Sequence, residues 1–258
     1  MPDPAHPAAP ARGEGGGVLV TRPLPAALAT AALLTARAYV PVIAPLLTIL
    51  PRDPMLPPPE TLQAVLAGSG NAVDHLPATH RRLRLLAVGD ATAARARHAG
   101  HAEVLSAAAD AARLAALAGE TLDPGGSPLL LAVGEGQGAG LEAALTARGF
   151  RVLRRAVYTT AAAATLPAVA RAALVAPAGA FARPLSEGQT LRAGLFFSAE
   201  TARVFRVLVE AEGLADRLGA IVALAISAAA AAELGPLPWR DVRVAAHPDQ
   251  AALLALLP

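Results

Sequence analysis

The sequence contains no cysteine and no lysine, and only 3% of its 258 residues are aromatic. The absence of cysteine excludes disulfides, thiolate nucleophiles and zinc–thiolate sites. The absence of lysine excludes a Schiff-base enzyme and an ordinary P-loop, because both depend on a lysine amine. All 22 basic residues are therefore arginine, and they exceed the 20 acidic residues by only two. Bulk charge gives no indication of a nucleic-acid partner.

Long apolar runs are also missing, although 54% of the residues are apolar. The longest candidate covers residues 220–232 and is interrupted by Ser227, which is too short for the ~18 residues that a membrane helix needs. We therefore expect no membrane partner. Residues 1–17 are rich in Pro, Ala and Gly, and they predict a disordered tail without a secretory signal. The cytoplasm is the default expectation for the location of the protein.

Short apolar strands alternate with helical segments along the rest of the chain. Such alternation is typical of parallel sheets with helices on both faces, so the sequence predicts an α/β fold. The predicted strands are 18–21, 63–66, 83–88, 103–105, 128–133, 194–197, 220–226 and 241–245. Three more segments, at 39–43, 46–49 and 150–159, are predicted to be extended.

An internal repeat is visible in the spacing of these elements. Gly89 and Ser227 each end a predicted strand, and each stands fifteen residues before a valine of the next strand, Val104 or Val242. Both of those valine-containing strands lead into a turn with an aspartate and then into a Leu/Ala-rich helix. The matching order of elements predicts two similar α/β domains.

One glycine-rich loop suggests a nucleotide. Residues Gly134 to Ala139 read GEGQGA, which fits a dinucleotide-binding turn between a strand and a helix. The acidic residue expected about twenty positions later is replaced by Arg154 and Arg155, which suit a 2′-phosphate. An NADP-dependent oxidoreductase is therefore one alternative. A simple strand-to-helix turn is the other interpretation of this loop.

Metal-site and hydrolase motifs are not found. His98 and His101 are three residues apart, but Gly100 lies between them and no third ligand accompanies them. The carboxylates are scattered, with no HExxH or EF-hand pattern and no G-x-S-x-G elbow. The arginines at 81, 82 and 84 lack interleaved aromatic residues and are typical of a solvated face. We expect no metal and no nucleic acid.

Small polar residues recur where predicted strands end and helices begin. In parallel sheets these strand ends form the crevice that binds ligands, and hydroxyls beside helix N-termini suit an anion. The same residue types also cap helices, and both interpretations are compatible. A non-enzymatic, hinged binding protein for a small anion is a second alternative. The residues are Thr21, Ser69, Asn71, Thr92, Ser198 and Ser227.

Several stretches, in this order, resemble the uroporphyrinogen-III synthase family. The resemblance extends over about residues 18–257 and rests on the order and spacing of the stretches. They are VLVTRP at 18–23, IAPLL at 43–47, SGNAV at 69–73, AVGDATA at 87–93, GFRV at 149–152 running into VY at 157–158, LFFS at 195–198, and AAHPD at 245–249 followed by AALL at 251–254.

The resemblance implies two α/β domains joined by a two-stranded linker, with the active-site cleft between them. The chain enters one domain, builds all of the second and then returns. The first domain is expected to comprise residues 18–38 and 160–258, and the second residues 52–150. The linker is expected at 39–51 and 151–159.

The resemblance also implies a reaction: hydroxymethylbilane is cyclised to uroporphyrinogen III, with inversion of ring D and loss of water, in tetrapyrrole (haem) biosynthesis. Such a lyase needs no cofactor. Tyr158 matches a tyrosine that the family often places facing the cleft, where its phenol would protonate or orient the departing hydroxyl. We also expect a monomer that transiently contacts the upstream bilane-forming enzyme. The substrate-binding residues expected are Thr21, Arg22, Ser69, Asn71, Gly89, Thr92, Ser198 and Ser227.

The sequence departs from the family pattern at three places. Val133 precedes Gly134 where the family commonly has an arginine. Ser227 replaces a glycine and Ala230 replaces a threonine, so a hydroxyl that could contact substrate is missing from the second half. Ser-Gly at 69–70 stands in place of the usual Thr-Ser.

Overall fold

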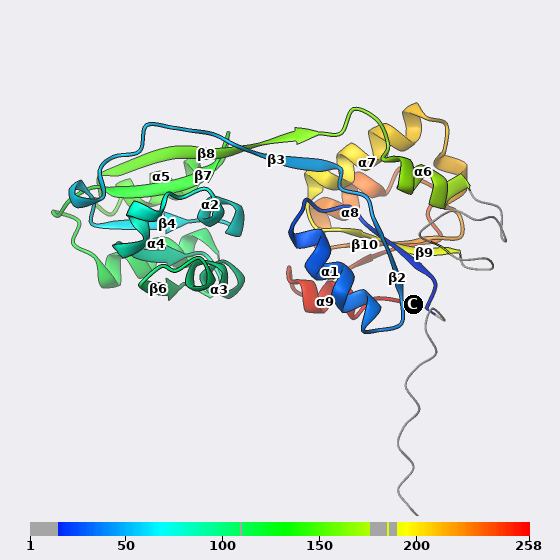
Figure 1. Cartoon of the computed structure of the whole chain (residues 1–258), viewed down its shortest axis with the longest axis horizontal. Helices are drawn as coiled ribbons and strands as arrows, with labels where there is room; N and C mark the ends of the chain where they lie inside the picture. The colour runs from blue at the N-terminus through cyan, green and yellow to red at the C-terminus, as the bar shows by residue number, and fades with distance from the viewer. Residues whose placement is uncertain (1–14, 109, 176–184, 186–189) are drawn as a thin grey trace, which may run out of the picture. The chain divides into compact units, whose positions relative to one another are not determined.

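Strands and helices alternate along the chain, as the sequence predicts, and form two mainly parallel sheets (Figure 1). The computed structural model describes residues 15–108, 110–175, 185 and 190–258. Residues 1–14 of the predicted tail lie outside the described residues, and Gly17 already belongs to a strand. The chain divides into two units. Unit 1 comprises the described residues of Met1–Thr48 and Ala161–Pro258, and unit 2 comprises those of Ile49–Thr160.

Unit 1 is built on a five-stranded sheet in which the neighbouring strands pair in parallel. Its spatial order is β11-β10-β9-β1-β2. The strands are β1 (Gly17–Val20), β2 (Val40–Ile43), β9 (Leu191–Phe196), β10 (Val222–Ala225) and β11 (Asp241–Val244). The helices are α1 (Ala26–Thr35), α6 (Ala168–Val175), α7 (Ala199–Ala211), α8 (Ala228–Leu234) and α9 (Gln250–Leu254), with a 3₁₀ turn η3 at Ala215–Leu218.

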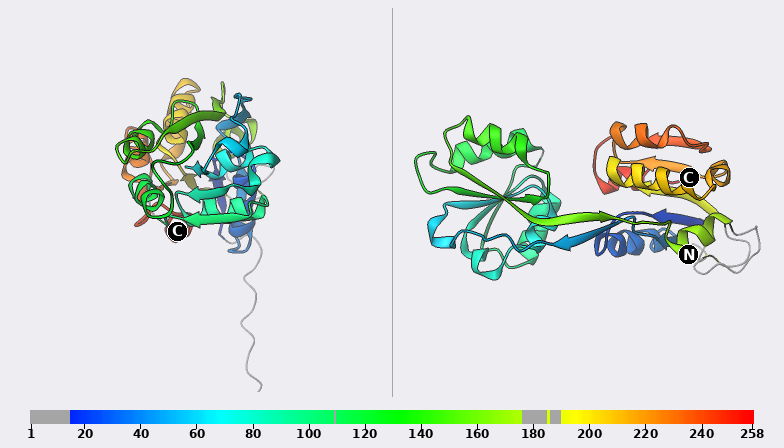
Figure 2. Two further views of the ribbon diagram at one scale, coloured as in Figure 1. Left: turned by 90° about the vertical axis from the view of Figure 1, so that its left-hand side faces the viewer. Right: turned by 90° about the horizontal axis from the view of Figure 1, so that it is seen from above.

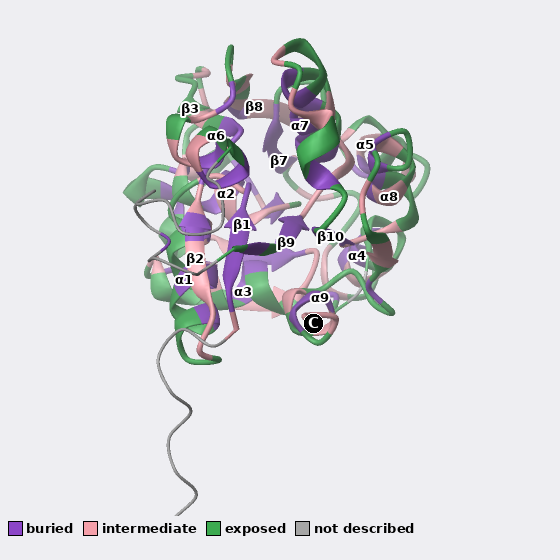
Figure 3. Cartoon of the chain, turned by 90° about the vertical axis from the view of Figure 1, so that its right-hand side faces the viewer, coloured by how far each residue is buried: buried purple, intermediate pink, exposed green. Residues whose placement is uncertain are grey.

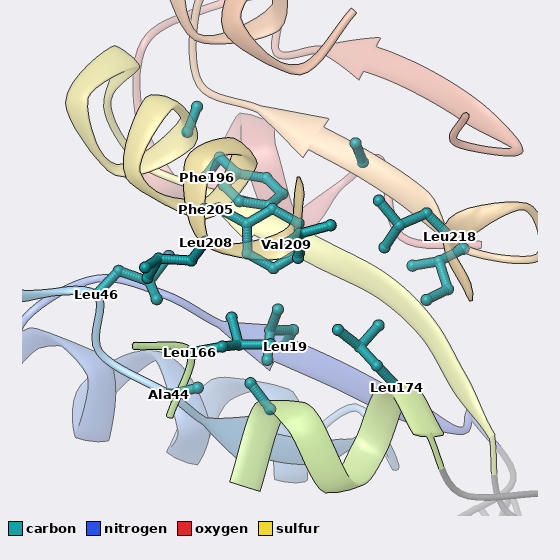
Figure 4. Close-up of a cluster of buried hydrophobic side chains, with 14 of the residues drawn as sticks. Leu19, Ala44, Leu46, Leu166, Leu174, Phe196, Phe205, Leu208, Val209 and Leu218 are labelled. Carbon is teal, nitrogen blue, oxygen red and sulfur yellow. The ribbon is translucent and has the colours of Figure 1, made fainter. Parts of the chain in front are cut away.

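Both faces of this sheet are buried, which explains the nearly continuous apolar character of its central strands (Figure 3). Leu19 and Phe196 point to one face and pack with α6, α7 and α8, where Phe205 completes the cluster in Figure 4. Val20 and Leu195 point to the opposite face and pack with α1 and α9. The helices thus cover the two faces of the sheet separately (Figure 2).

The segment 39–51 is expected to be wholly part of the linker, but the structure divides it differently. Val40–Ile43 forms β2, which pairs in parallel with β1 and completes a β1-α1-β2 unit. Pro41 lies opposite Val18 in this register. A proline is tolerated there because β2 is an edge strand and needs to donate hydrogen bonds on one side only.

Unit 2 is built on a six-stranded sheet of order β3-β8-β7-β4-β5-β6. The two faces are covered by α2 with α3 and by α4 with α5. The strands are β3 (Leu47–Pro51), β4 (Ala64–Ala67), β5 (Arg84–Ala87), β6 (Glu103–Ser106), β7 (Leu129–Gly134) and β8 (Val152–Ala162). The helices are α2 (Gly70–Asp74), α3 (Asp90–His98), α4 (Ala111–Thr121) and α5 (Ala139–Thr146), with 3₁₀ turns η1 (Pro59–Thr61) and η2 (Ala78–Arg82).

The chain leaves unit 1 within β3 and returns to it within β8. These two strands are neighbours in the sheet. The amide of Arg52 donates to the carbonyl of Val157, and the amide of Ala163 donates to the carbonyl of Leu46. The partners run in opposite chain order, so β3 and β8 are antiparallel.

The two units share one topology, which confirms the predicted pair of similar α/β domains. The five parallel strands of unit 2, read as β8-β7-β4-β5-β6, correspond to β2-β1-β9-β10-β11 of unit 1. Unit 2 is thus a circular permutation of unit 1. In both units the direction of strand addition reverses once, between β7 and β4 in unit 2 and between β1 and β9 in unit 1. The carboxyl ends of strands at such a reversal are the usual ligand site in open α/β sheets.

Candidate functional site

A chain of three polar side chains lies at the reversal point of unit 2. Ser69 is the N-cap of α2, and its Oγ accepts a hydrogen bond from the amide of Ala72 at 3.2 Å. The same Oγ lies 3.2 Å from the phenol oxygen of Tyr158. Tyr158 in turn donates to Oε1 of Gln137 at 3.3 Å. Because Tyr158 donates its proton to Gln137, the hydroxyl of Ser69 is the donor to Tyr158.

The phenol of Tyr158 reaches this point because the residue opposite it has no side chain. Tyr158 lies on β8 and pairs with Gly134 after a shift in register between Val133 and Gly134. A β-carbon built on Gly134 would meet the phenol ring, 2.7 Å from Cζ and 2.9 Å from the hydroxyl oxygen. The side chain is packed in the protein, with 3% of the residue exposed. The missing side chain of Gly134 therefore makes room for the ring of Tyr158, in addition to any role of this glycine in the turn that follows.

The glycine loop that suggested a nucleotide has other partners in the structure. Gly136 and Gly138 have φ angles of +74° and +86°, which only glycine adopts readily, and α5 begins at the next residue. Nε of Arg154 lies 2.7 Å from a carboxylate oxygen of Glu142, and its NH1 donates to the carbonyl of Gln137 at 2.9 Å. The guanidinium of Arg154, which the nucleotide interpretation assigned to a 2′-phosphate, is thus bonded to the glycine loop and to the helix that follows it. These contacts favour the interpretation as a strand-to-helix turn.

The other residues expected to bind substrate in unit 2 follow the adjacent strands β4 and β5. Asn71 is half-buried in the first turn of α2, and its carbonyl accepts a hydrogen bond from Nδ1 of His75 at 2.7 Å. Gly89 is the N-cap of α3, with open space where a side chain would be. Thr92 is buried in the first turn of the same helix. The topology brings all three to the edge that carries Ser69, because β4 and β5 are parallel neighbours.

In unit 1 the reversal point carries a guanidinium. Arg22 follows β1 and is half-buried over the ring of Phe197, 4.1 Å from its centroid. NH1 donates to Oε1 of Gln250 at 2.8 Å. Burial lowers the pKa of Arg22, and this arginine takes part in none of the ion pairs formed by the described residues. Such an arginine is suited to receive a carboxylate from a ligand.

Thr21 stands beside Arg22 but is fully buried. Its hydroxyl donates to the carbonyl of Leu195 at 2.7 Å, so it ties the end of β1 to β9. Thr21 therefore fixes the end of the strand that leads to Arg22.

Two serines at the carboxyl edge of unit 1 act as helix caps. Ser198 caps α7 by accepting from the amide of Thr201 at 3.1 Å, and Ser227 caps α8 by accepting from the amide of Ala230 at 3.3 Å. Each serine side chain thereby satisfies one backbone N–H group in the first turn of its helix. Ala230 is fully buried. Capping and ligand contact are compatible, because each serine still lies at a strand end.

Two residues near Tyr158, Gln137 and His75, are not among the site residues predicted from the sequence. Gln137 belongs to the glycine loop, where the motif leaves that position free. The ring of His75 lies with its centroid 5.9 Å from that of Tyr158, at an interplanar angle of 33°. His75 also lines an open groove of about 780 Å³ between the proline-rich segment 51–60 and residues 74–80. The one sequence signal for His75 is its position four residues after Asn71, one helical turn away.

Within the described ranges, His, Asp and Glu side chains form no group of three that could hold a metal ion. Across the same ranges, no helix has both the length and the apolar character required to span a bilayer.

Comparison with known proteins decides the family. The model of the family described as uroporphyrinogen-III synthase HemD matches residues 29–255. The chain belongs to the uroporphyrinogen-III synthase family. This is a family of cyclising lyases of haem biosynthesis, so the protein is an enzyme of that class. The resemblance seen in the sequence is thereby confirmed.

Two solved structures are similar to this chain. The uroporphyrinogen-III synthetase of Helicobacter pylori is 16% identical, with a TM-score of 0.58 and with 95% of this chain and 98% of that chain covered. A mutant uroporphyrinogen III synthase from the extremely thermophilic bacterium Thermus thermophilus is 20% identical, with a TM-score of 0.45 and coverage of 93% and 96%. The first likeness shows that the fold is shared. No curated protein matched the sequence.

Proposed function

We propose that the protein converts hydroxymethylbilane to uroporphyrinogen III, with loss of water and inversion of ring D. The observation that carries this proposal is the phenol of Tyr158, which lies at the reversal point of its sheet between Ser69 and Gln137 in a member of this family. A positioned hydroxyl at a strand-end ligand site is what the loss of a hydroxyl group from the substrate requires.

The reaction is a rearrangement in which protons balance. The terminal hydroxyl of the substrate leaves as water after gaining one proton, and the methylene carbon left behind becomes part of an azafulvene cation. The substituted carbon of ring D attacks this carbon to form a spiro intermediate, which fragments and closes again at the free α-carbon of ring D. That α-carbon loses one proton, so the proton taken up in the first step is returned in the last.

In this reaction Tyr158 donates a hydrogen bond or a proton to the departing hydroxyl. The bond from Tyr158 to Gln137 is long, at 3.3 Å, and Gln137 is exposed, so the substrate hydroxyl can replace this acceptor. Ser69 keeps the phenol oriented by donating to its oxygen. Ser69 is itself fixed by the amide of Ala72. The contribution of Tyr158 is chiefly orientation and general acid catalysis.

The polycarboxylate substrate also needs cationic and N–H partners. Arg22 supplies a guanidinium that pairs with no carboxylate among the described residues, and it is held against Phe197 and Gln250. Charge-assisted hydrogen bonds of this kind are stronger than neutral ones. We assign Asn71, Gly89 and Thr92 to the same task in unit 2. In unit 1, Ser198 and Ser227 contribute at the N-termini of the helices that they cap, and Thr21 contributes by fixing β1.

The proposal extends to the setting of the enzyme. It acts as a monomer in the cytoplasm and receives hydroxymethylbilane from the upstream bilane-forming enzyme through transient contact. Light scattering during size-exclusion chromatography tests the oligomeric state, and a mass of one chain is the expected result.

Product isomer analysis tests the proposed reaction. Hydroxymethylbilane is generated in situ, the purified protein is added, and the products are oxidised and separated by chromatography. Mostly isomer III supports the synthase. Only isomer I, as in the protein-free control, overturns it and leaves an anion-binding protein as the alternative. Saturable micromolar binding of NADPH, followed by fluorescence, would instead support the oxidoreductase alternative.

A further inference from the structure

The groove that His75 lines is a second feature of unit 2 that the proposed function does not yet use. One wall is the proline-rich segment that follows β3, and the other is formed by the end of α2 and by η2. His80 joins the two walls, because its Nε2 lies 3.1 Å from the carbonyl of Pro57. Leu56 and Leu76 make part of the lining apolar. A groove of about 780 Å³ with an apolar lining accommodates a flat aromatic ring.

His75 is the group in this groove with a nitrogen available to a ligand. Its Nδ1 is hydrogen-bonded to the carbonyl of Asn71 at 2.7 Å, and a carbonyl can only accept, so Nδ1 carries a proton. In the neutral imidazole the other nitrogen, Nε2, therefore has a free lone pair. None of the hydrogen bonds recorded among the described residues uses Nε2 of His75.

Three of the other charged or titratable groups around the groove have partners. Arg52 forms an ion pair with Glu135, and Asp74 forms one with Arg95. His80 is engaged at both ring nitrogens, with Thr79 and with the carbonyl of Pro57. The remaining lining groups are Asp53 and Glu60, which are exposed and form no ion pair within the described residues.

We propose that this groove receives ring D of the substrate and that Nε2 of His75 accepts the proton that ring D loses. The inference rests on the proposed function. The bond from the free α-carbon of ring D to its hydrogen breaks, its electron pair restores the aromatic pyrrole, and the proton goes to Nε2. Tyr158 supplies a proton to the departing hydroxyl, and the ring of His75 lies beside that of Tyr158. Tyr158 thus provides the proton that the substrate takes up, and His75 accepts the proton that the substrate loses.

Isotopic substitution tests this assignment directly. The substrate is hydroxymethylbilane with deuterium at the free α-carbon of ring D, compared with the unlabelled compound. His75→Phe keeps an aromatic ring against Tyr158 and removes both nitrogens, and His75→Gln keeps polar atoms but cannot act as a base. We expect kcat to fall about 10²-fold in both variants, with KM within about twofold. We also expect a larger deuterium isotope effect on kcat than in the wild type, because proton removal becomes rate-limiting.

The matched control is His98→Gln, an exposed histidine on the neighbouring helix α3. It should leave both kcat and the isotope effect unchanged. A fall in kcat without any change in isotope effect would assign His75 a packing role and overturn the proposal, as would an unchanged kcat in His75→Phe. If the wild type itself yields only isomer I, the proposed function fails together with this assignment. If it yields isomer III and His75→Phe turns over normally, only the assignment of His75 fails.

Discussion

The phenol ring of Tyr158 fills the space that a side chain at position 134 would need, so only glycine fits opposite it. Gly134 and Tyr158 are paired across β7 and β8, and a β-carbon on residue 134 would lie 2.7 Å from Cζ of Tyr158. Non-bonded carbons do not approach so closely, so one of the two side chains must move. The glycine that looked like part of a nucleotide loop therefore sets the position of the proposed acid.

Replacing Gly134 by alanine should displace the phenol from Ser69 and Gln137. We expect kcat for isomer III to fall about 10²-fold, because a small misplacement of a catalytic group has effects of that size. The added methyl group should lower the free energy of unfolding by about 1–3 kcal/mol. Steady-state assays and urea denaturation measure the two effects. The control is Gly140→Ala in α5, where an added β-carbon meets no atom within 4 Å. Normal turnover by Gly134→Ala would contradict the placement of Tyr158.

Replacing Tyr158 by phenylalanine keeps the ring and removes the hydroxyl. We expect kcat to fall by about 10²- to 10⁴-fold, the usual contribution of a general acid. The free energy of unfolding should fall by only about 1–2 kcal/mol, because two hydrogen bonds are lost. Turnover is measured by chromatography of oxidised products, and stability by thermal melting. Equal turnover with an unchanged melting temperature would remove Tyr158 from the mechanism.

Replacing Arg22 by glutamine should weaken substrate binding more than it slows the chemical step. The variant loses a charge-assisted interaction with a substrate carboxylate, so KM should rise about 10-fold or more. The contact of the guanidinium with Phe197 is also lost, and a small decrease in stability should accompany the change. Arg37→Gln is the control, because Arg37 is an exposed arginine at the end of α1. An unaltered KM would argue against a role for Arg22 in binding.

Buried His101 should make unit 2 less stable in acid. Burial lowers the pKa of His101, with further lowering by the positive charge of Arg81 and by His80, and its Nδ1 has no hydrogen-bond partner among the described residues. The unfolded chain then binds a proton more readily than the folded protein. No penalty exists above the unfolded pKa of about 6.5, and stability is lost as the pH falls below that value toward the folded pKa.

The variant His101→Leu should show a smaller loss of unfolding free energy between about pH 7.5 and about pH 5 than the wild type. Urea denaturation at the two pH values measures this difference. His98→Gln should retain the wild-type dependence, because His98 is exposed. Identical pH dependence in His101→Leu and the wild type would show that His101 does not titrate across folding.

Contacts close in sequence were predictable, and contacts across the fold were not. Three serines expected at strand ends each accept from the amide three residues later, since a cap needs only the local chain. The bond from Thr21 to the carbonyl of Leu195 joins residues 174 positions apart. β2 was missed as a member of a sheet, because a four-residue strand containing proline carries little pattern of its own.

The sequence by itself determined the alternation of strands and helices, the repeat of two α/β units, the helix caps and the family, because each depends on local pattern or on the order of short motifs. Tertiary structure alone decided that the phenol of Tyr158 meets Ser69 and Gln137, that Arg22 rests on Phe197 beside Gln250, and that His75 lies against Tyr158. The physical reason is that most of these contacts join separate elements, and only the packing of both sheet faces fixes which side chains reach one edge.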